Sequence, residues 1–149
     1  MFQEDVAKVL LHGLAALRKE VEAYPGEAAL WRAVPGLANP GGNLALHLAG
    51  NLQHFIGGEL GHSGYVRDRD REFSVRDLPR AQVLAEIDAA AAAVEKALAD
   101  LDPAVLETVF PLPLGGQRLG TRQFLIHLCG HLNYHLGQVN CHRRVVTGS

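Results

Sequence analysis

Two uncharged stretches restrict the possible folds of this sequence more than any other feature. No Asp, Glu, Lys or Arg occurs from Asn43 to Gly58, or from Gln123 to His142. Within the first stretch, large apolar residues recur at the three- or four-residue spacing of one helix face, at Leu44, Leu48, Leu52 and Phe55. Because an uncharged helix needs a partner surface around most of its circumference, we expect helices over residues 43–60 and 122–146 to form the inner pair of a helical fold.

Two further segments predict amphipathic helices that would cover this pair. Residues 2–23 place apolar side chains at helical spacing with charged residues between them. Residues 77–101 contain the alanine-rich run VLAEIDAAAAAVEKALADL, which has a high helix propensity. Strand signals are scarce by comparison. The sequence therefore predicts an all-α protein, a four-helix bundle with a long crossover connection, built as a single domain over residues 1–149.

The connections between these helices are rich in polar residues, Pro and Gly. We expect residues 61–76, which include the run RDRDR, to form the crossover as an exposed connection that is too polar to bury. Residues 107–121 predict two short extended pieces around Gly115 and Gly116. Thr121 is the expected N-cap of the last helix.

The composition argues against several classes of function. The net charge is −2, and the arginines of RDRDR alternate with acids, so we expect no nucleic-acid partner. No apolar run approaches the roughly 18 residues that a membrane-spanning helix needs, so we expect no membrane association. The chain begins MFQED, with two acids where a signal peptide would carry basic residues. These features predict a cytoplasmic protein.

Six of the eight histidines lie on the two uncharged helices, at positions 47, 54, 127, 131, 135 and 142. His131 and His135 are four residues apart and therefore neighbours on one helix face, so they can chelate one ion. His47 and His54 are seven residues apart on the other uncharged helix, and either could complete a three-histidine set. Three neutral imidazoles suit Zn, Ni, Fe or Cu and leave coordination positions open for water or substrate.

Two more residues on the last helix are candidates for the surroundings of such a site. Gln138 lies three residues beyond His135 on the same face, where it could hydrogen-bond a ligand ring nitrogen and fix its tautomer. His127 continues the four-residue series but is rotated about 80° from His135 around the helix axis, so we interpret it as a core or entrance histidine. The remaining histidines are expected to be surface or hydrogen-bonded polar residues, at positions 12, 62 and 142.

Other metal and nucleophile motifs are incomplete. Glu59 and His62 have the spacing of one half of a di-iron site, but the last helix has no acid after Arg122. Leu132 follows His131 where a zinc protease of the HExxH type needs its glutamate. The two cysteines, at 129 and 141, are expected to be core thiols rather than nucleophiles. No residue is assigned a catalytic role.

Three segments together resemble the DinB/YfiT-like superfamily. They are the histidine context HLAGN in GNLALHLAGNLQHF, the segment FLIHLCGHLNYHLGQVN on the last helix, and the preceding extended stretch VFPLPLGGQRLGTRQFL. The resemblance implies a four-helix bundle with a long crossover and a metal site of three histidines, one from the second helix and two from the last. Carried onto this sequence, these are His47, His131 and His135. His54 competes for the place on the second helix, and the HLAGN context favours His47.

The resemblance also implies a cofactor and a class of reaction. Characterised members of the superfamily include transferases that use low-molecular-weight thiols such as bacillithiol, and mycothiol-dependent isomerases. The leading hypothesis is therefore a thiol S-transferase that acts on electrophilic small molecules and holds a divalent metal ion (Zn, Ni or Fe). The metal would coordinate the sulfur of bacillithiol or a similar thiol and lower its pKa.

Two alternatives remain at this point. A metal-dependent hydrolase would use the same ligands, but it needs a nearby base, and Glu59 lies about 18 Å from His47 along the helix. A non-catalytic, metal-binding stress-response protein would act by dimerising. The two uncharged helices are suited to a dimer interface as well as to a ligand pocket. We therefore expect a homodimer. We also expect the substrate to be a small molecule.

Overall fold

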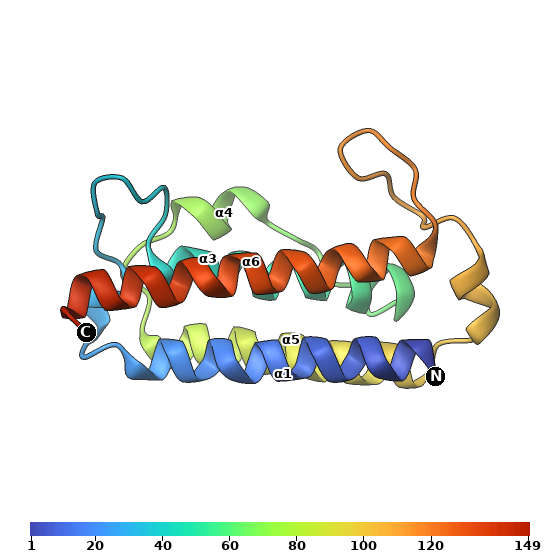
Figure 1. The fold of residues 1–149 in the computed structure, drawn as a ribbon, viewed down its shortest axis with the longest axis horizontal. Coiled ribbons are helices and arrows are strands. Elements are labelled where there is room, and N and C mark those ends of the chain that lie inside the picture. The colour runs from blue at the N-terminus through green and yellow to red at the C-terminus, as the bar shows by residue number, and fades with distance from the viewer.

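Four long helical segments run side by side in the computed structural model, which describes residues 1–149 (Figure 1). Two of them, α1 and α6, run in one direction, and the other two, α3 and α5, run in the opposite direction (Figure 1). The bounds are α1 (Phe2–Ala23), α3 (Gly41–Leu52) with its π-helical continuation η1 (Gln53–Leu60), α5 (Arg80–Ala99) and α6 (Thr121–Thr147). The predicted all-α class is confirmed, since the chain forms no named strand.

Three short helices lie in the connections, and none of the helices combines the length and apolarity needed to span a bilayer. Helix α2 (Glu27–Leu30) follows α1, helix α4 (Arg69–Ser74) lies between η1 and α5, and the 3-10 helix η2 (Pro103–Glu107) precedes α6. Between η2 and α6 the chain forms two isolated antiparallel bridges, Val109 with Gly120 and Leu114 with Gln117. The two short extended pieces expected around Gly115 and Gly116 are therefore present, but they pair only through these two bridges and form no strand.

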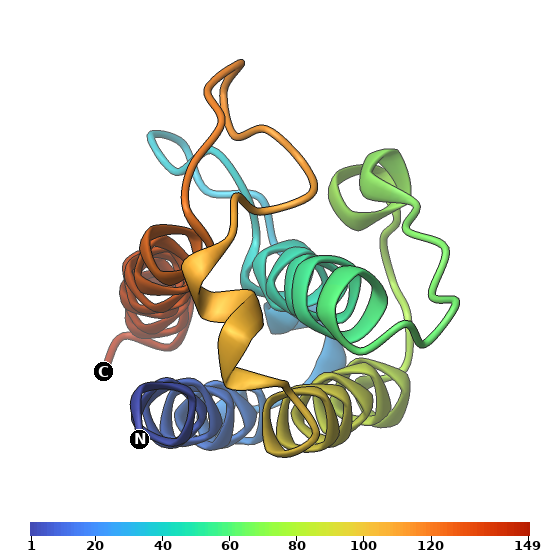
Figure 2. The same ribbon diagram turned by 90° about the vertical axis from the view of Figure 1, so that its right-hand side faces the viewer.

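The hydrophobic core lies between two pairs of helices. Seen along the helix axes, α1 and α5 lie on one side of the molecule, α3 and α6 on the other, and α4 lies outside α3 (Figure 2). Helix α1 buries the apolar side chains that its three- and four-residue spacing places on one face, Val6, Leu10, Leu14, Leu17 and Val21. Gly13 lets α1 approach α6 closely, because a Cβ there would lie only 2.6 Å from Cδ2 of Leu132.

Of the two uncharged helices, α3 is fully buried within the chain and α6 is not. All twelve residues of α3 are buried, since α5, α6 and α4 all pack against it. Helix α6 packs against α1 and α3 with one side only. Its other side is exposed although it carries no charge: Ile126 is 59% exposed and Tyr134 is 67% exposed.

The connection over residues 61–76 is more structured than its polarity predicts. It contains α4, whose first turn is capped by the Asp68 side chain accepting a hydrogen bond from the Arg71 amide. Glu72 is only 3% exposed. Burial of this carboxylate is tolerated because Arg67 and His47 satisfy it, as described below. A second small correction concerns Thr121, which is the first residue of α6, whereas Gly120 is its N-cap.

Candidate metal centre

Three histidines from two helices meet near the middle of α6. His47 projects from α3, and His131 and His135 project from α6, one helical turn apart. One ligand nitrogen from each ring lies within 4.8 Å of the other two. The ring centroids are 4.6–5.0 Å apart, and the ring planes cross at 74–90°. The nitrogen lone pairs of this histidine cluster therefore approach a common point from three directions, as a set of metal ligands does.

The tautomer of His47 is fixed by a buried carboxylate. Nδ1 of His47 lies 3.1 Å from Oε1 of Glu72. An Nη nitrogen of Arg67 lies 3.3 Å from the same Nδ1, but it donates to Oε1 of Glu72 at the shorter distance of 2.9 Å. Because an ionised carboxylate only accepts hydrogen bonds, Nδ1 carries the proton and Nε2 keeps its lone pair. Arg67 holds the same carboxylate with two hydrogen bonds of 2.9 Å, from Nε to Oε2 and from an Nη nitrogen to Oε1. The Arg67–Glu72 pair therefore orients the His47 ring from behind.

Gln138 fixes His135 in the same way. Its Oε1 lies 2.6 Å from Nδ1 of His135, and since an amide oxygen accepts, Nδ1 donates and Nε2 is left free. His131 has no such support. Its Nε2 lies 3.1 Å from Nε2 of His47, while its Nδ1 is buried without a hydrogen-bond partner.

The protein environment keeps the α6 histidines neutral. Burial, reinforced by the neighbouring His135 and His47 rings, lowers the pKa of His131 to about 3. Burial also lowers the pKa of His135, although its hydrogen bond with Gln138 acts in the opposite direction. Both rings therefore present lone pairs at neutral pH, which is the form that binds metal ions.

These observations fit a divalent metal ion at the histidine cluster. Hydrogen bonding alone leaves the cluster incomplete: an Nε2–H of His131 can donate to the lone pair of His47 Nε2, but Nδ1 of His131 is then a buried acceptor without a partner. Two nitrogens that are each about 2.0–2.1 Å from one ion are roughly 3 Å apart, and the observed separation is 3.1 Å. No Asp or Glu belongs to the histidine cluster, so its three neutral rings would not balance the positive charge of a bound ion.

The histidine cluster lies in a hollow of about 440 Å³, which we call the metal hollow. This volume is in the range of small-ligand sites. Asn51, one turn beyond His47 on α3, also lines the hollow, and its Oδ1 is buried without a partner. The hollow is lined by Asn39, His47, Asn51, Phe55, Arg67, Arg69, Phe73, Leu114, His127, Leu128, His131 and His135.

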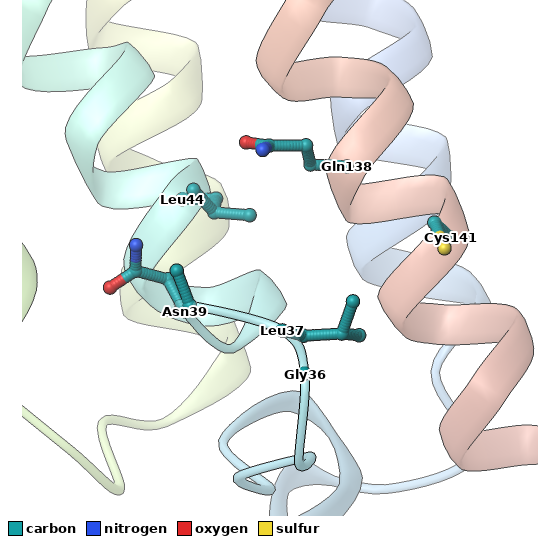
Figure 3. Close-up of a pocket in the computed structure, with 7 residues that line it drawn as sticks. Gly36, Leu37, Asn39, Leu44, Gln138 and Cys141 are labelled. Carbon is teal, nitrogen blue, oxygen red and sulfur yellow. The ribbon is translucent and has the colours of Figure 1, made fainter.

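A second cavity, of about 230 Å³, adjoins the metal hollow. It lies between α6 and the loop that precedes α3, and the Gln138 side chain extends across it from α6 toward α3 (Figure 3). Asn39 lines both spaces. Gln138 therefore contacts both the histidine cluster and the second cavity. Its oxygen accepts a hydrogen bond from His135, and its side chain forms part of the cavity wall.

The structure separates the other candidate histidines from the cluster. His54 lies on η1, outside the group of converging nitrogens and outside the hollow, so of the two α3–η1 candidates only His47 meets the α6 pair. His127 is exposed and lines the hollow, with its ring centroid 6.1 Å from that of His131. Of the two interpretations of His127, a core residue or an entrance residue, its exposure favours the second.

His142 is buried and fully hydrogen-bonded, whereas His12 and His62 are exposed. Neither cysteine lines the metal hollow. Cys129 is half-buried against the core, and burial raises the pKa of its thiol. Cys141 is exposed, so the expectation of a core thiol is wrong there. It lines the second cavity from α6 (Figure 3).

Sequence reasoning missed the Arg67–Glu72 pair. The charge run RDRDRE is typical of a solvated segment, so its last acid did not stand out as a buried one. A weak signal was present, because Phe73 and Val75 follow at once and give the segment an apolar side. The contact with His47 spans 25 residues, and no local pattern encodes it.

Comparison with known protein families identifies the superfamily of the chain. The family model of the DinB superfamily matches residues 10–139. The chain belongs to the DinB superfamily. The matched range includes all three histidines of the cluster, together with Glu72 and Gln138. No curated protein matches the chain.

Proposed function

We propose that the protein is a metal-dependent S-transferase that uses a low-molecular-weight thiol, such as bacillithiol, to attack electrophilic small molecules. The observation that supports this most is the make-up of the metal hollow. Three imidazoles converge in it, and no Asp, Glu, Cys, Ser or Lys side chain lines it. The chain therefore offers no nucleophile of its own, and a thiol would bring one.

The metal would be Zn, Ni or Fe, and when bound it would act as a Lewis acid that lowers the pKa of a coordinated thiol. The chain's own residues position and shield the reactants. Glu72 and Gln138 hold two ligand rings in the tautomer that leaves Nε2 free. Phe55, Phe73 and Leu128 give part of the hollow an apolar wall. The unpartnered Oδ1 of Asn51 is available to accept a hydrogen bond from a ligand.

The proposal is tested by thiol-dependent conjugation of 1-chloro-2,4-dinitrobenzene. Bacillithiol, glutathione and cysteine are compared with the metal-loaded and the chelator-treated protein. We expect product formation that needs both the metal and one of the thiols, is lost in His131→Ala and is kept in His12→Ala, a change of an exposed histidine outside the site. Equal rates with and without the metal would contradict the proposal.

A metal-dependent hydrolase is the second candidate, and His127 is the observation in its favour. This exposed histidine lines the hollow without belonging to the cluster, so it can serve as a general base. Glu72 cannot, because Arg67 and His47 already engage both of its oxygens. Ester cleavage without any thiol, abolished by His127→Ala at full metal content, would rank the hydrolase first.

The assembly of the protein is also part of the proposal. We propose that the helices form the four-helix bundle with crossover that the superfamily implies, and that the protein is a homodimer. The outer side of α6, where Ile126 and Tyr134 are exposed and no charge occurs between Arg122 and Arg143, supports a dimer surface. Sedimentation of the wild type and Tyr134→Lys tests it: we expect a dimer that the added charge converts to a monomer.

A further inference from the structure

The three arginines of the RDRDR run have different partners, and the central one is unpaired. Arg67 pairs with Glu72, and Arg71 pairs with Glu86. Arg69 forms no ion pair, although it lines the metal hollow. Its guanidinium carbon lies 5.1 Å from the ring centroid of Phe73. A free cation is thus held at the hollow by stacking on an aromatic ring.

Phe73 connects this cation to the histidine cluster. The centroid of the Phe73 ring lies 4.7 Å from that of His47, and the two rings are tilted by 40°. The guanidinium carbon of Arg69 and the centroid of the His47 ring are therefore separated by at most the sum of these two distances. This cation–π contact restrains the guanidinium, and its N–H groups, which make no hydrogen bond within the protein, remain free to donate paired hydrogen bonds.

The charge balance of the hollow favours an anion beside Arg69. No acidic side chain lines the hollow, and the charge of Arg67 is compensated by Glu72. The three ligands of the proposed metal are neutral imidazoles, so they add no negative charge. A ligand that fills the hollow therefore meets two uncompensated positive charges, one at the cluster and one at Arg69.

We propose that Arg69 binds a carboxylate of the small molecule that occupies the metal hollow. One end of this ligand lies at the histidine cluster, and its carboxylate accepts hydrogen bonds from the guanidinium stacked on Phe73. The inference deepens the proposed function, since the carboxylate belongs either to the thiol or to its electrophilic co-substrate. It names the substrate class as anionic.

Two pairs of probes on the cobalt-substituted protein test this. The first pair is 3-mercaptopropionate and its amide, which differ only in the carboxylate and whose binding is followed by the sulfur-to-cobalt absorption band. The second pair, succinate and succinamate, contains no thiol and is followed by the cobalt visible spectrum with and without saturating 2-mercaptoethanol. Each Kd is measured for the wild type, Arg69→Gln and Arg144→Gln. Arg144 is the matched control, because it lies in the last turn of α6 and does not line the hollow.

We expect Arg69→Gln to weaken binding of each acid by about 10-fold or more, as for a charge-assisted hydrogen bond, and to change the amides less than twofold. Arg144→Gln should change neither. A loss confined to the mercapto acid assigns the carboxylate to the thiol, and a loss confined to succinate beside 2-mercaptoethanol assigns it to the co-substrate. If no thiol gives the sulfur band while succinate still needs Arg69, the S-transferase proposal fails and the anion site stands. Equal effects of Arg69→Gln on acids and amides would overturn the inference.

Discussion

At the scale of single residues, the candidate centre depends on which nitrogen of each histidine is protonated. Hydrogen bonds determine the protonated nitrogen in two of the three rings. Glu72 does so for His47, and Gln138 does so for His135. The sequence could predict the second of these contacts, because the partners are three residues apart on one helix. It could not predict the first, because Glu72 reaches His47 only after α4 has packed on α3.

Replacing Glu72 by Gln should weaken metal binding by about 10- to 100-fold, the usual effect of losing a carboxylate behind a ligand histidine. The amide keeps the size of the side chain but removes the charge that holds the proton on His47 Nδ1. A competition titration with a chromophoric zinc chelator measures the change. Glu86→Gln is the control, because Glu86 pairs with Arg71 away from the hollow. Equal Kd values for wild type and Glu72→Gln would show that the carboxylate has no such role.

His142 gives the fold a pH dependence that is separate from the metal centre. Its Nε2 lies 2.8 Å from the carbonyl oxygen of Arg32 and donates to it, so Nδ1 is an acceptor, with the Gly41 amide at 3.1 Å as donor and the Tyr24 hydroxyl, which also reaches the Val139 carbonyl, at 2.7 Å. Burial lowers the pKa of His142. The unfolded chain therefore takes up this proton first as the pH falls, and the stability that His142 contributes above about pH 6.5 is lost below it.

We accordingly expect His142→Gln to lower the free energy of unfolding by about 1–3 kcal/mol at pH 7.5 and by clearly less at pH 5. Urea denaturation of the metal-free protein at both pH values measures this. His12→Gln, an exposed change, should follow the wild type at both. A destabilisation by His142→Gln that is the same at pH 7.5 and pH 5 would refute the assignment.

At the scale of elements, helices with a regular apolar repeat can be predicted from the sequence. Features that depend on contacts between elements cannot. Helix α1 ends where it was expected, whereas α5 begins at Arg80, three residues after the predicted start, with Pro79 as its N-cap. Helix α4 was missed because its stabilisation comes from a capping Asp68 and from packing on α3 rather than from an apolar repeat. The exposed side of α6 was missed because absence of charge does not show which faces find a partner.

The contact between α3 and α4 depends on Gly50. A Cβ at this position would overlap the Glu72 carboxylate, so Gly50→Ala should displace Glu72 from His47. We expect a loss of stability of about 1–3 kcal/mol together with weaker metal binding. Gly130→Ala is the matched control, because nothing lies within 4 Å of a Cβ there, and it should gain up to about 1 kcal/mol from helix propensity. Urea denaturation and zinc titration of both variants test the pair, and unchanged zinc affinity in Gly50→Ala would contradict the argument.

At the scale of the whole molecule, the candidate centre joins helices that are distant in sequence. His47 and His131 are 84 residues apart, and each comes from a different long helix. The sequence could show that both uncharged helices carry histidines, but the register of α3 against α6 follows from how the two helices pack together along their length. Choosing His47 over His54 therefore required either the family resemblance or the structure.

Because the centre connects α3 and α6, metal binding should stabilise the entire fold. A ligand that binds only the folded state, at about 100 times its Kd, adds about 2.7 kcal/mol, which corresponds to a rise in Tm of roughly 5–10 °C for a domain of this size. We expect zinc to raise the Tm of the chelator-treated wild type and of His12→Ala by this amount, and to leave the Tm of His131→Ala unchanged. Thermal scans followed by circular dichroism, with and without zinc, measure these shifts. An equal rise in His131→Ala would place the metal elsewhere and would remove the basis for the centre.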